Sequence, residues 1–548
     1  MFDMLAAGSH GVLDTIQPAI ILLGLGILAA LTAKTLRLNP IVGYIILGVA
    51  LSFGGLAERF DGAVVAALAE AGVMFLLFNL GLHFSLARIR EEARNIFGFG
   101  ALQMGIAGGG FTALGLLFGL APLAAILGGF AMALSSTAVV IGVVRERDQE
   151  DCPVGRAAQS ILIFQDIAAI ALLIVAGSLG SGEALGPSLG MAALKALGAF
   201  AVAALFARYL TEPLFRLVTR ADSSEVLTAT ALFIALAAGW LTGIAGLSLT
   251  LGAFLGGMAL ADSRYRLLVQ TEIEAFRGLF LGFFFMTVGL SIQPGVITAN
   301  WHWVLMTAAA LVALKCIFNI AAGLTNRWSV PGSVQLGFLL GQGSEFALVL
   351  FSLPAVALLF GAELLGIAIS AIALTMALTP PLSEAGRTLA GKLRRGPADE
   401  RMLGDGADIL LVNLGETGRS IADRMADGDI SYLAVDSDRD RFETALADGY
   451  PVHFLPAADP RSWQALGLNK RKGVVVTQGS MDRVRELGPL IRDAAPDIER
   501  LIAVEDMADY PDLDDDRTQF FAVDGAGGHD RLHDALLRLL SAERRSNA

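Results

Sequence analysis

Charged residues are scarce in this 548-residue chain, and the scarcity is uneven. Only 17% of the residues are Asp, Glu, Lys or Arg and 55% are hydrophobic. The mean hydropathy of +0.63 excludes an ordinary soluble protein. Residues 1 to about 381 hold nearly all of the apolar excess, whereas the rest has the composition of a globular segment. The sequence therefore predicts a membrane domain over 1–383, a linker over 384–405 and a cytoplasmic domain over 406–548.

Three further features of the sequence argue against particular classes of protein. The chain has only two cysteines, Cys152 and Cys316, which lie far apart and exclude a disulfide framework or a cysteine metal site. Its N-terminus has neither a basic stretch nor a cleavage site before the first apolar run, so we expect a retained helix there. The net charge of −12 argues against nucleic acid as a partner.

Thirteen apolar runs predict membrane helices. A helix needs about 20 residues to cross a hydrocarbon layer of ~30 Å, and the second, ninth and tenth runs are shorter than the others. The predicted spans are 17–36, 40–56, 62–82, 96–119, 122–144, 157–179, 188–210, 225–243, 246–261, 276–293, 301–325, 334–353 and 355–380.

Positive charge is nearly missing from every second loop. The loops after even-numbered spans contain essentially only Arg59. The loops after odd-numbered spans and the residues after the last span contain Lys34, Arg37, Arg88, Arg90, Arg94, Arg145, Arg147, Arg156, Arg208, Arg216, Arg220, Arg264, Arg266, Arg277, Arg327, Lys392, Arg394 and Arg395. Because basic loops stay in the cytoplasm, we expect a periplasmic N-terminus and a cytoplasmic C-terminal domain.

The sixth span contains an unusual carboxylate. The run Ser160–Ile170 is apolar except for its polar first residue and the pair Gln165 and Asp166. A charge at bilayer depth costs at least ~3 kcal/mol, so Asp166 indicates a functional site. Lys315 and Glu345 are charged residues that also lie in predicted spans. A structural salt bridge between Lys315 and Asp166 is the alternative interpretation.

Two spans are interrupted at corresponding positions of an inverted repeat. Spans two to six and nine to thirteen form two sets of five helices with opposite directions, and the fourth member of each set contains small or polar residues. These interruptions are Leu134–Ala138, with Ser135, Ser136 and Thr137, and Gly341–Phe346. Such paired interruptions indicate a substrate site, because unwound backbone in a membrane persists only where it lines a cavity. Serines that bond to their own helix are the alternative.

The residues at these positions resemble the monovalent cation:proton antiporter-2 family, most closely its Kef-type members. The matching segments are Leu80–Leu86, Leu134–Ala138, Gly155–Arg156, Phe164–Asp166, Leu251–Leu255, Tyr265–Arg266, Phe284–Phe285, Val288–Ile292 and Gly341–Phe346. The resemblance implies an NhaA-like helical fold with two broken, crossing helices, in a homodimer whose core moves like an elevator. It also implies exchange of potassium for protons across the bacterial inner membrane.

The resemblance implies roles for single residues. Asp166 is expected to bind either the monovalent cation or a proton, next to Gln165, where electrogenic relatives have a second carboxylate. One titrating group then predicts electroneutral, one-for-one exchange. The remaining expected ion-site residues are Ser135, Ser136 and Thr137, and the expected charge partners in the core are Lys315, Glu345 and Arg156.

The predicted cytoplasmic domain alternates apolar strands with helical patterns. The strands are expected at Ile409–Leu414, Tyr432–Val435, Val452–Leu455, Val474–Thr477, Leu501–Val504 and Phe520–Val523. This alternation predicts a doubly wound parallel sheet with a Rossmann-like fold. It resembles the regulatory RCK or KTN domain (TrkA-N-like) attached to Kef antiporters and potassium channels.

The nucleotide fingerprint of that domain is incomplete. The family's first turn reads G-x-G-x-x-G, with which a backbone approaches a pyrophosphate, and this chain has Asn413 in the first position. Leu455–Pro456 replaces the family's Gly-Asp after the third strand. The candidate nucleotide-binding residues are Gly415, Gly418, Asp436 and Arg439. AMP, NAD(H) and no nucleotide all stay open.

Two other transport functions are alternatives to potassium/proton exchange. A sodium/proton exchanger of the same fold is the first alternative, because ligand types do not fix the radius of a site. An RCK-gated potassium channel is the second, but Thr287–Leu290 lacks the tyrosine and glycine of a channel filter. Leu267 and Glu272 replace the histidine and aspartate of glutathione-gated members, which argues against glutathione control. No catalytic constellation supports an enzyme.

Overall fold

The computed structural model describes most of the chain. The described residues are 2–36, 39–60, 62–84, 89–90, 92–147, 149–150, 152–179, 185–220, 223–245, 248–394, 407–427, 430–455, 466, 468, 471–477, 481–504, 517–522 and 535. Parts of the predicted features lie outside these ranges, among them Arg37 and Arg88 of the basic loops, Ser85 and Leu86 of the first motif, residues 246–247 of the ninth span, linker residues 395–405, Pro456 and Val523.

The chain forms two compact units. The first comprises Met1–Val139, Ile161–Lys315 and Gln342–Thr379, and the second comprises Val140–Ser160, Cys316–Gly341 and Pro380–Ala548. Two segments of the predicted membrane domain therefore cluster with the C-terminal domain, which the sequence did not predict.

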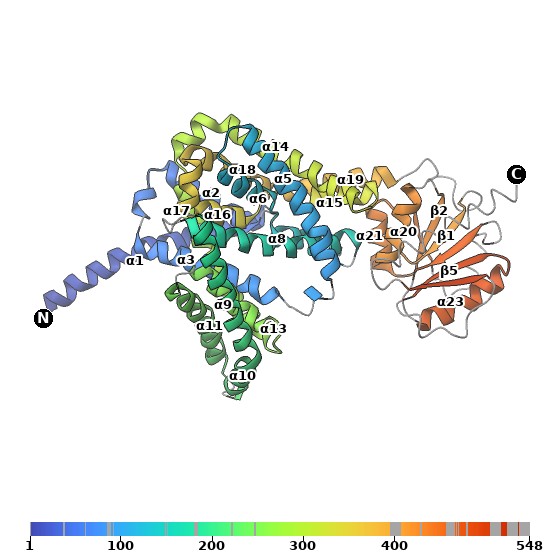
Figure 1. Ribbon diagram of the computed structural model, residues 1–548, viewed down its shortest axis with the longest axis horizontal. Coiled ribbons are helices and arrows are strands. Elements are labelled where there is room, and N and C mark those ends of the chain that lie inside the picture. The colour runs from blue at the N-terminus through green and yellow to red at the C-terminus, as the bar shows by residue number, and fades with distance from the viewer. Residues whose placement is uncertain are drawn as a thin grey trace. The chain divides into compact units, whose positions relative to one another are not determined.

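The predicted membrane domain is entirely helical in its described part. Its elements are α1 (Phe2–Thr35), α2 (Pro40–Phe53), η1 (Ala57–Arg59), α3 (Ala63–His83), η2 (Asn95–Gly100), α5 (Ala101–Leu117), α6 (Pro122–Ala133), α7 (Thr137–Glu146), α8 (Pro153–Ser178), α9 (Leu185–Tyr209), α10 (Thr211–Arg220), α11 (Ser224–Ile244), α12 (Leu249–Ala261), α13 (Arg266–Ser291), α14 (Pro294–Thr325), α15 (Val330–Leu339), α16 (Glu345–Ser352), α17 (Pro354–Phe360) and α18 (Ala362–Ala377). Figure 1 shows these helices along the chain.

The lengths of these helices support a polytopic membrane protein. Among the described residues, seven helices are long and apolar enough to cross a membrane, and ten are if each of three bent pairs is one span. Three shorter apolar helices, α2, α12 and α15, lie at further predicted spans. Every predicted span overlaps an apolar helix, and the count of thirteen stays a prediction.

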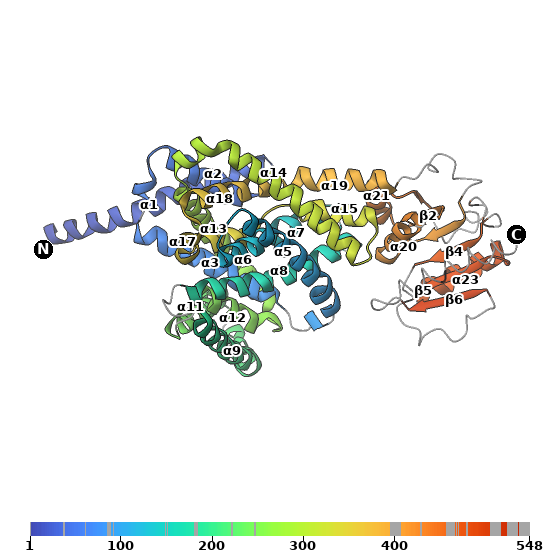
Figure 2. The ribbon, with the colours of Figure 1, turned by 45° about the horizontal axis from the view of Figure 1, so that its top comes forward.

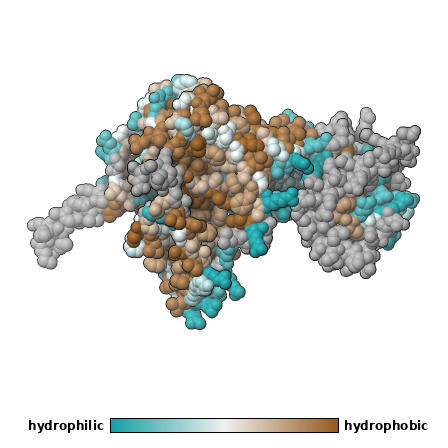
Figure 3. Space-filling view, in the orientation of Figure 1, coloured by the Kyte–Doolittle hydropathy of each residue, from teal (hydrophilic) through white to brown (hydrophobic). Residues whose placement is uncertain are grey.

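The surface of these helices is apolar, as a lipid-facing surface must be. Figure 3 shows hydrophobic residues over much of the visible helical part of the chain. Large apolar side chains that are more than half exposed include Leu117, Phe118, Leu197, Phe233, Trp240, Trp301 and Leu358. A soluble protein rarely exposes so much contiguous apolar surface.

Local signals fix where the broken helices begin. Pro122 and Pro331 occupy the first turn of α6 and α15, where a missing N–H costs nothing. Ser329 caps α15 by accepting a hydrogen bond from the Gly332 N–H, and Ser344 caps α16 by accepting one from the Phe346 N–H. A serine cap contributes about 1 kcal/mol, so the second break is encoded by the sequence around it.

The C-terminal domain contains the predicted parallel sheet. Its strands are β1 (Ile409–Val412), β2 (Tyr432–Asp436), β3 (Val452–Phe454), β4 (Gly473–Val476), β5 (Glu499–Val504) and β6 (Thr518–Ala522). They pair in the order β3-β2-β1-β4-β5-β6, and every pair is parallel. Each strand overlaps its predicted range, so the doubly wound fold is confirmed.

Helices cover both faces of this sheet. The elements are α20 (Glu416–Asp427), α21 (Arg439–Ala447) and α23 (Met481–Ala494). Ile421 and Met425 of α20 pack on one face with Ile409 and Leu411, and Leu487 of α23 packs on the other face. Figure 2 shows α23 lying across β4, β5 and β6. The carboxyl ends of β1 and β4 meet at the point where the strand order reverses.

The described part of the predicted linker is helical. Helix α19 runs from Thr379 to Arg394 and therefore includes the first part of the predicted linker 384–405. The stretch was predicted as a linker from its basic residues, from Pro397 and from its glycines, of which Gly386 lies within the helix. Because Leu389, Ala390, Lys392 and their neighbours favour helix, one glycine does not end it.

Candidate functional site

The first helix break exposes backbone groups inside the apolar unit. Helix α6 ends at Ala133 and α7 begins at Thr137, as the predicted interruption at Leu134–Ala138 requires. Ser135 and Ser136 are at most 1% exposed. Buried backbone without helical partners must bond elsewhere, and the following contacts supply those bonds.

Asp166 of α8 lies against the start of α7. Its side chain is buried, and the Thr137 hydroxyl donates a hydrogen bond of 3.0 Å to Asp166 Oδ1. The N-terminus of a helix carries a partial positive charge that favours an anion. Asp166 and Thr137 thus place oxygen ligands, which suit a monovalent cation, at the first break.

Gln165 is held by three hydrogen bonds. Its Oε1 accepts from the Ser135 N–H at 2.7 Å, while its Nε2 donates to Gln103 Oε1 at 2.9 Å and to Ala133 O at 3.4 Å. The Gln165 amide therefore fixes the broken backbone and in turn depends on Gln103. Gln103 was not predicted as a site residue, although it is a lone amide in the apolar run of α5, as Gln165 is in the apolar run of α8.

Lys315 of α14 joins the two breaks. It is fully buried, and its Nζ donates to Leu134 O, to Ser135 Oγ at 3.0 Å and to Gln342 O at 2.6 Å. Leu134 follows α6 and Gln342 follows α15, so the ammonium lies where two helices end. Cations stabilise helix C-termini, which accounts for a lysine at this depth.

Glu345 has the complementary position at helix starts. It is the first residue of α16 and 2% exposed, and its carboxylate is hydrogen-bonded to the Ser136 hydroxyl and to the backbone N–H of Ala138. Carboxylates stabilise helix N-termini. Lys315 and Glu345 together therefore balance the partial charges of four helix ends, and Asp166 adds a second carboxylate beside Ser136–Ala138.

Arg156 does not lie at this site. It is ten residues before Asp166 on α8, which separates the two by about 15 Å at 1.5 Å per residue. Its guanidinium forms an ion pair of 2.6 Å with Glu416 of the C-terminal domain. The prediction of Arg156 as a core charge partner is corrected accordingly, because helical spacing puts it near the end of the helix.

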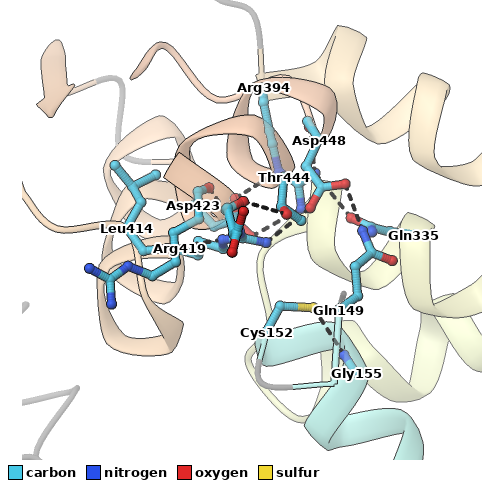
Figure 4. A network of polar contacts seen from close by, with 12 residues as sticks. Gln149, Cys152, Gly155, Gln335, Arg394, Leu414, Arg419, Asp423, Thr444 and Asp448 are labelled. Carbon is cyan, nitrogen blue, oxygen red and sulfur yellow. Dashed lines mark hydrogen bonds and ion pairs between the residues drawn. The ribbon is translucent and has the colours of Figure 1, made fainter. Parts of the chain in front are cut away.

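A second polar network lies within the C-terminal unit (Figure 4). Asp448 accepts from Gln149 Nε2 at 2.8 Å and from Arg419 Nη1 at 3.0 Å, and its backbone carbonyl accepts from Arg394 Nη1 at 3.0 Å. Burial raises the pKa of the Asp448 carboxyl, although Arg419 and Arg394 oppose this shift. Figure 4 shows Gln149 and Arg394 reaching this residue from different elements.

Arg394 is the centre of this network. Its guanidinium pairs with Asp423 at 2.9 Å, donates to Gln335 Oε1 at 3.0 Å and lies 4.5 Å from the centroid of the Tyr450 ring. Burial alone would lower the pKa of Arg394, but the charge of Asp423 raises it. Ser329 also donates to Asp423 at 3.0 Å, so residues of three chain segments converge on one buried ion pair.

Three of the candidate nucleotide residues, Gly415, Gly418 and Asp436, lie beside the end of β1. Asn413 has a φ of 75°, a left-handed conformation that asparagine tolerates better than most residues. A Cβ on Gly418 would lie 2.1 Å from Asn413 O, so glycine is required where α20 approaches this turn. Asp436 is buried, whereas Arg439 is exposed and pairs with Glu443 at 2.7 Å.

Known proteins resemble both parts of the chain. The sodium/hydrogen exchanger transmembrane family matches residues 20–384, and the TrkA-N domain family matches residues 409–514.

Two relatives are similar along most of the chain. The glutathione-regulated potassium-efflux system protein KefC of Salmonella typhimurium is 33% identical over 507 residues, which are 90% of this chain and 80% of that protein. The chloroplastic K(+) efflux antiporter 1 of Arabidopsis thaliana is 32% identical over 80% of this chain and 38% of its own length.

Among solved structures, the sodium proton antiporter MjNhaP1 of Methanocaldococcus jannaschii is 18% identical, with a TM-score of 0.49 and coverage of 71% of this chain and 99% of that one. The chain belongs to the sodium/hydrogen exchanger family and, within it, to the Kef-type monovalent cation:proton antiporters that carry a C-terminal TrkA-N domain.

Proposed function

We propose that this antiporter exchanges potassium for protons across the bacterial inner membrane and that Asp166 carries either ion. Both relatives are named for potassium efflux. The observation that carries the proposal is a buried carboxylate whose bonded partner, Thr137, begins a helix at a break. A buried carboxylate without a bonded cationic side chain in the described part of the site binds a cation when ionised and must otherwise take up a proton.

Competition of potassium and a proton for one carboxylate predicts the stoichiometry of the exchange. Glu345 stays bound to Ser136 and to the Ala138 N–H, and Lys315 stays bound to the carbonyls of both breaks. Among the described groups of the site, Asp166 is then the one that we expect to change occupant, since Gln165 does not titrate. The proposal is therefore electroneutral exchange, one potassium for one proton, in a homodimer whose core moves like an elevator.

Transport by reconstituted protein tests this directly. Purified protein is placed in liposomes that contain a pH-sensitive dye, and a pulse of potassium should move protons. Asp166→Asn should reduce the signal to that of empty liposomes while the protein elutes normally in size-exclusion chromatography. Glu58→Gln, an exposed carboxylate of η1, is the control and should keep full exchange. Exchange that survives in Asp166→Asn would refute the role of Asp166.

The same assay separates the alternatives. A response to sodium and none to potassium would replace the proposed cation by sodium. Single-channel currents that survive Asp166→Asn would instead indicate an RCK-gated channel. An imposed membrane potential should leave the exchange rate unchanged, and a rate that varies with voltage would contradict one-for-one exchange.

The proposed orientation places the N-terminus in the periplasm and the C-terminal domain in the cytoplasm. It rests on the basic residues that follow alternate spans. A single cysteine introduced into the loop at Gly55, in a chain without Cys152 and Cys316, should react in whole cells with a thiol reagent that does not cross membranes. A reaction only after the cells are broken would reverse the orientation.

A further inference from the structure

The nucleotide position of the C-terminal domain is closed by the chain's own groups. The strand order reverses between β1 and β4, and ligands of doubly wound folds bind at that point, outside the carboxyl ends of the strands. Here Asn413 Nδ2 donates to Thr477 O at 3.3 Å, and Thr477 Oγ1 donates back to Asn413 O at 2.5 Å. These two bonds join the ends of β1 and β4 across the crevice.

The acidic residue at the end of β2 is already occupied. In dinucleotide-binding domains this carboxylate accepts from a ribose hydroxyl. Asp436 instead accepts from the Leu414 N–H at 2.8 Å, from the Asp438 N–H at 2.9 Å and from Arg441 at 3.2 and 3.3 Å. It is 2% exposed, so both of its oxygens are used by the protein.

The negative charge at the start of α20 also disfavours the binding of a phosphate. A pyrophosphate is stabilised by N–H groups and positive charge at a helix N-terminus, but the first residue of α20 is Glu416. Asn413 Oδ1, the buried polar atom without a partner in the described part of this turn, is an acceptor and repels phosphate oxygens. The described residues therefore do not fit a dinucleotide.

Glu416 binds another part of the same chain. Its carboxylate pairs with Arg156 at 2.6 Å, a residue from the first turn of α8. One helical turn further along α20, Arg419 holds Asp448, which accepts from Gln149 just before α8. Seven residues after Glu416, Asp423 meets Ser329, which caps α15. Acidic groups along α20 and at the end of α21 thus contact the residues that begin α8 and α15.

We propose that Glu416, Asp423 and Asp448 form a docking surface for the chain's own segments 149–156 and 329–335, and that this docking takes the place of dinucleotide binding in the C-terminal domain. Charge complementarity carries the choice of occupant, because Arg156 supplies the positive charge that Glu416 requires. Arg394 reinforces the same surface, since its guanidinium bonds to Asp423, to the Asp448 carbonyl and to Gln335. Docking can be measured without transport, so this inference and the proposed function fail independently.

The alkylation rate of Cys152 measures whether the surface is docked. Cys152 lies between Gln149 and Arg156, is 6% exposed and accepts a hydrogen bond from the Gly155 N–H. Burial raises the pKa of its thiol, so it should react slowly with N-ethylmaleimide while the surface is docked. The measurement uses the full-length protein with Cys316→Ser, which leaves one cysteine, and follows its alkylation rate at neutral pH.

Charge reversal tests the ion pair. Glu416→Arg and Arg156→Glu should each speed the alkylation of Cys152 by about 3- to 10-fold, because each turns the attraction between the two side chains into a repulsion. The double variant, which exchanges the two charges, should return the rate to near that of the parent. Arg145→Glu is the matched control, because Arg145 pairs locally with Glu150 at 3.0 Å and 71% of its side chain is exposed. Single variants that react like the parent, or a double variant that does not recover, would overturn the docking.

Nucleotides test the second half of the inference. AMP and NADH, each at about 1 mM, should leave both the melting temperature and the Cys152 alkylation rate of the full-length protein unchanged. A ligand present at 100 times its Kd stabilises by about 2.7 kcal/mol, so micromolar binding would be visible. A rise in melting temperature with either nucleotide would show that the site accepts it and would overturn the proposal.

Discussion

The bonds of Lys315 predict a specific cost for its removal. Lys315→Met keeps the length of the side chain and deletes the three hydrogen bonds to Leu134 O, Ser135 Oγ and Gln342 O. Each buried carbonyl left without a partner costs about 1–3 kcal/mol, and the lost charge at the helix C-termini costs about 0.3–1 kcal/mol more. Relief from burying an ammonium offsets part of this sum. We expect a net destabilisation of about 2–5 kcal/mol.

Thermal unfolding of the purified protein measures this cost. At roughly 2 °C per kcal/mol for a domain of this size, Lys315→Met should lower the melting temperature by about 4–10 °C and abolish exchange, because the two breaks lose their common anchor. Lys34→Met is the matched control, since Lys34 is exposed in the last turn of α1 and should change the melting temperature by less than about 2 °C. A Lys315→Met protein that melts and transports like the parent would refute the assignment of Lys315 to the helix ends.

Three further predictions concern other positions. Gln103→Leu should raise the potassium concentration needed for half-maximal exchange and destabilise the protein by about 1–3 kcal/mol, because Gln165 loses its 2.9 Å partner; an unchanged potassium dependence would contradict this. Gly418→Ala should destabilise the C-terminal domain by about 1–3 kcal/mol through overpacking, whereas Gly488→Ala, whose Cβ meets nothing within 4 Å, should be neutral or slightly stabilising in thermal melts. Burial raises the pKa of Asp448 above its ordinary value of 3.8, so the folded protein takes up this proton at a higher pH than the unfolded chain does. The stability of the parent relative to Asp448→Asn should therefore rise as pH falls through the raised pKa towards 3.8. A stability difference that shrinks over that range in pH-dependent melts would contradict the shift.

Features that depend on local pattern could be predicted from the sequence. The strands of the C-terminal domain lie where alternation and turn residues predict them, and both breaks occur where small and polar residues interrupt an apolar run. Helix α19 runs into the predicted linker as far as Arg394, because composition does not show where a helix ends. The distance between Arg156 and the ion site could also have been predicted, since ten residues of helix separate Arg156 from Asp166.

Partners that are distant in sequence could not be predicted. Gln165 depends on Gln103, which is 62 positions earlier, and Lys315 bonds to Leu134, 181 positions earlier. Any buried polar group in an apolar run needs a partner, but the sequence offers several candidates and no distances. Salt-bridge pairing of Lys315 with Asp166 was one such candidate, and the carbonyls at the breaks are among the partners that Lys315 has.

The sequence by itself determined that this chain has an apolar helical part with a carboxylate at membrane depth, two helix breaks and a parallel-sheet domain, because hydropathy and periodicity are local properties. Only the tertiary structure decided which groups meet. It placed Lys315 at two helix ends, Glu345 at two helix starts and Arg156 against Glu416. The physical reason is that charge compensation depends on the ends of helices and on their approach in space, which no periodicity within a single helix specifies.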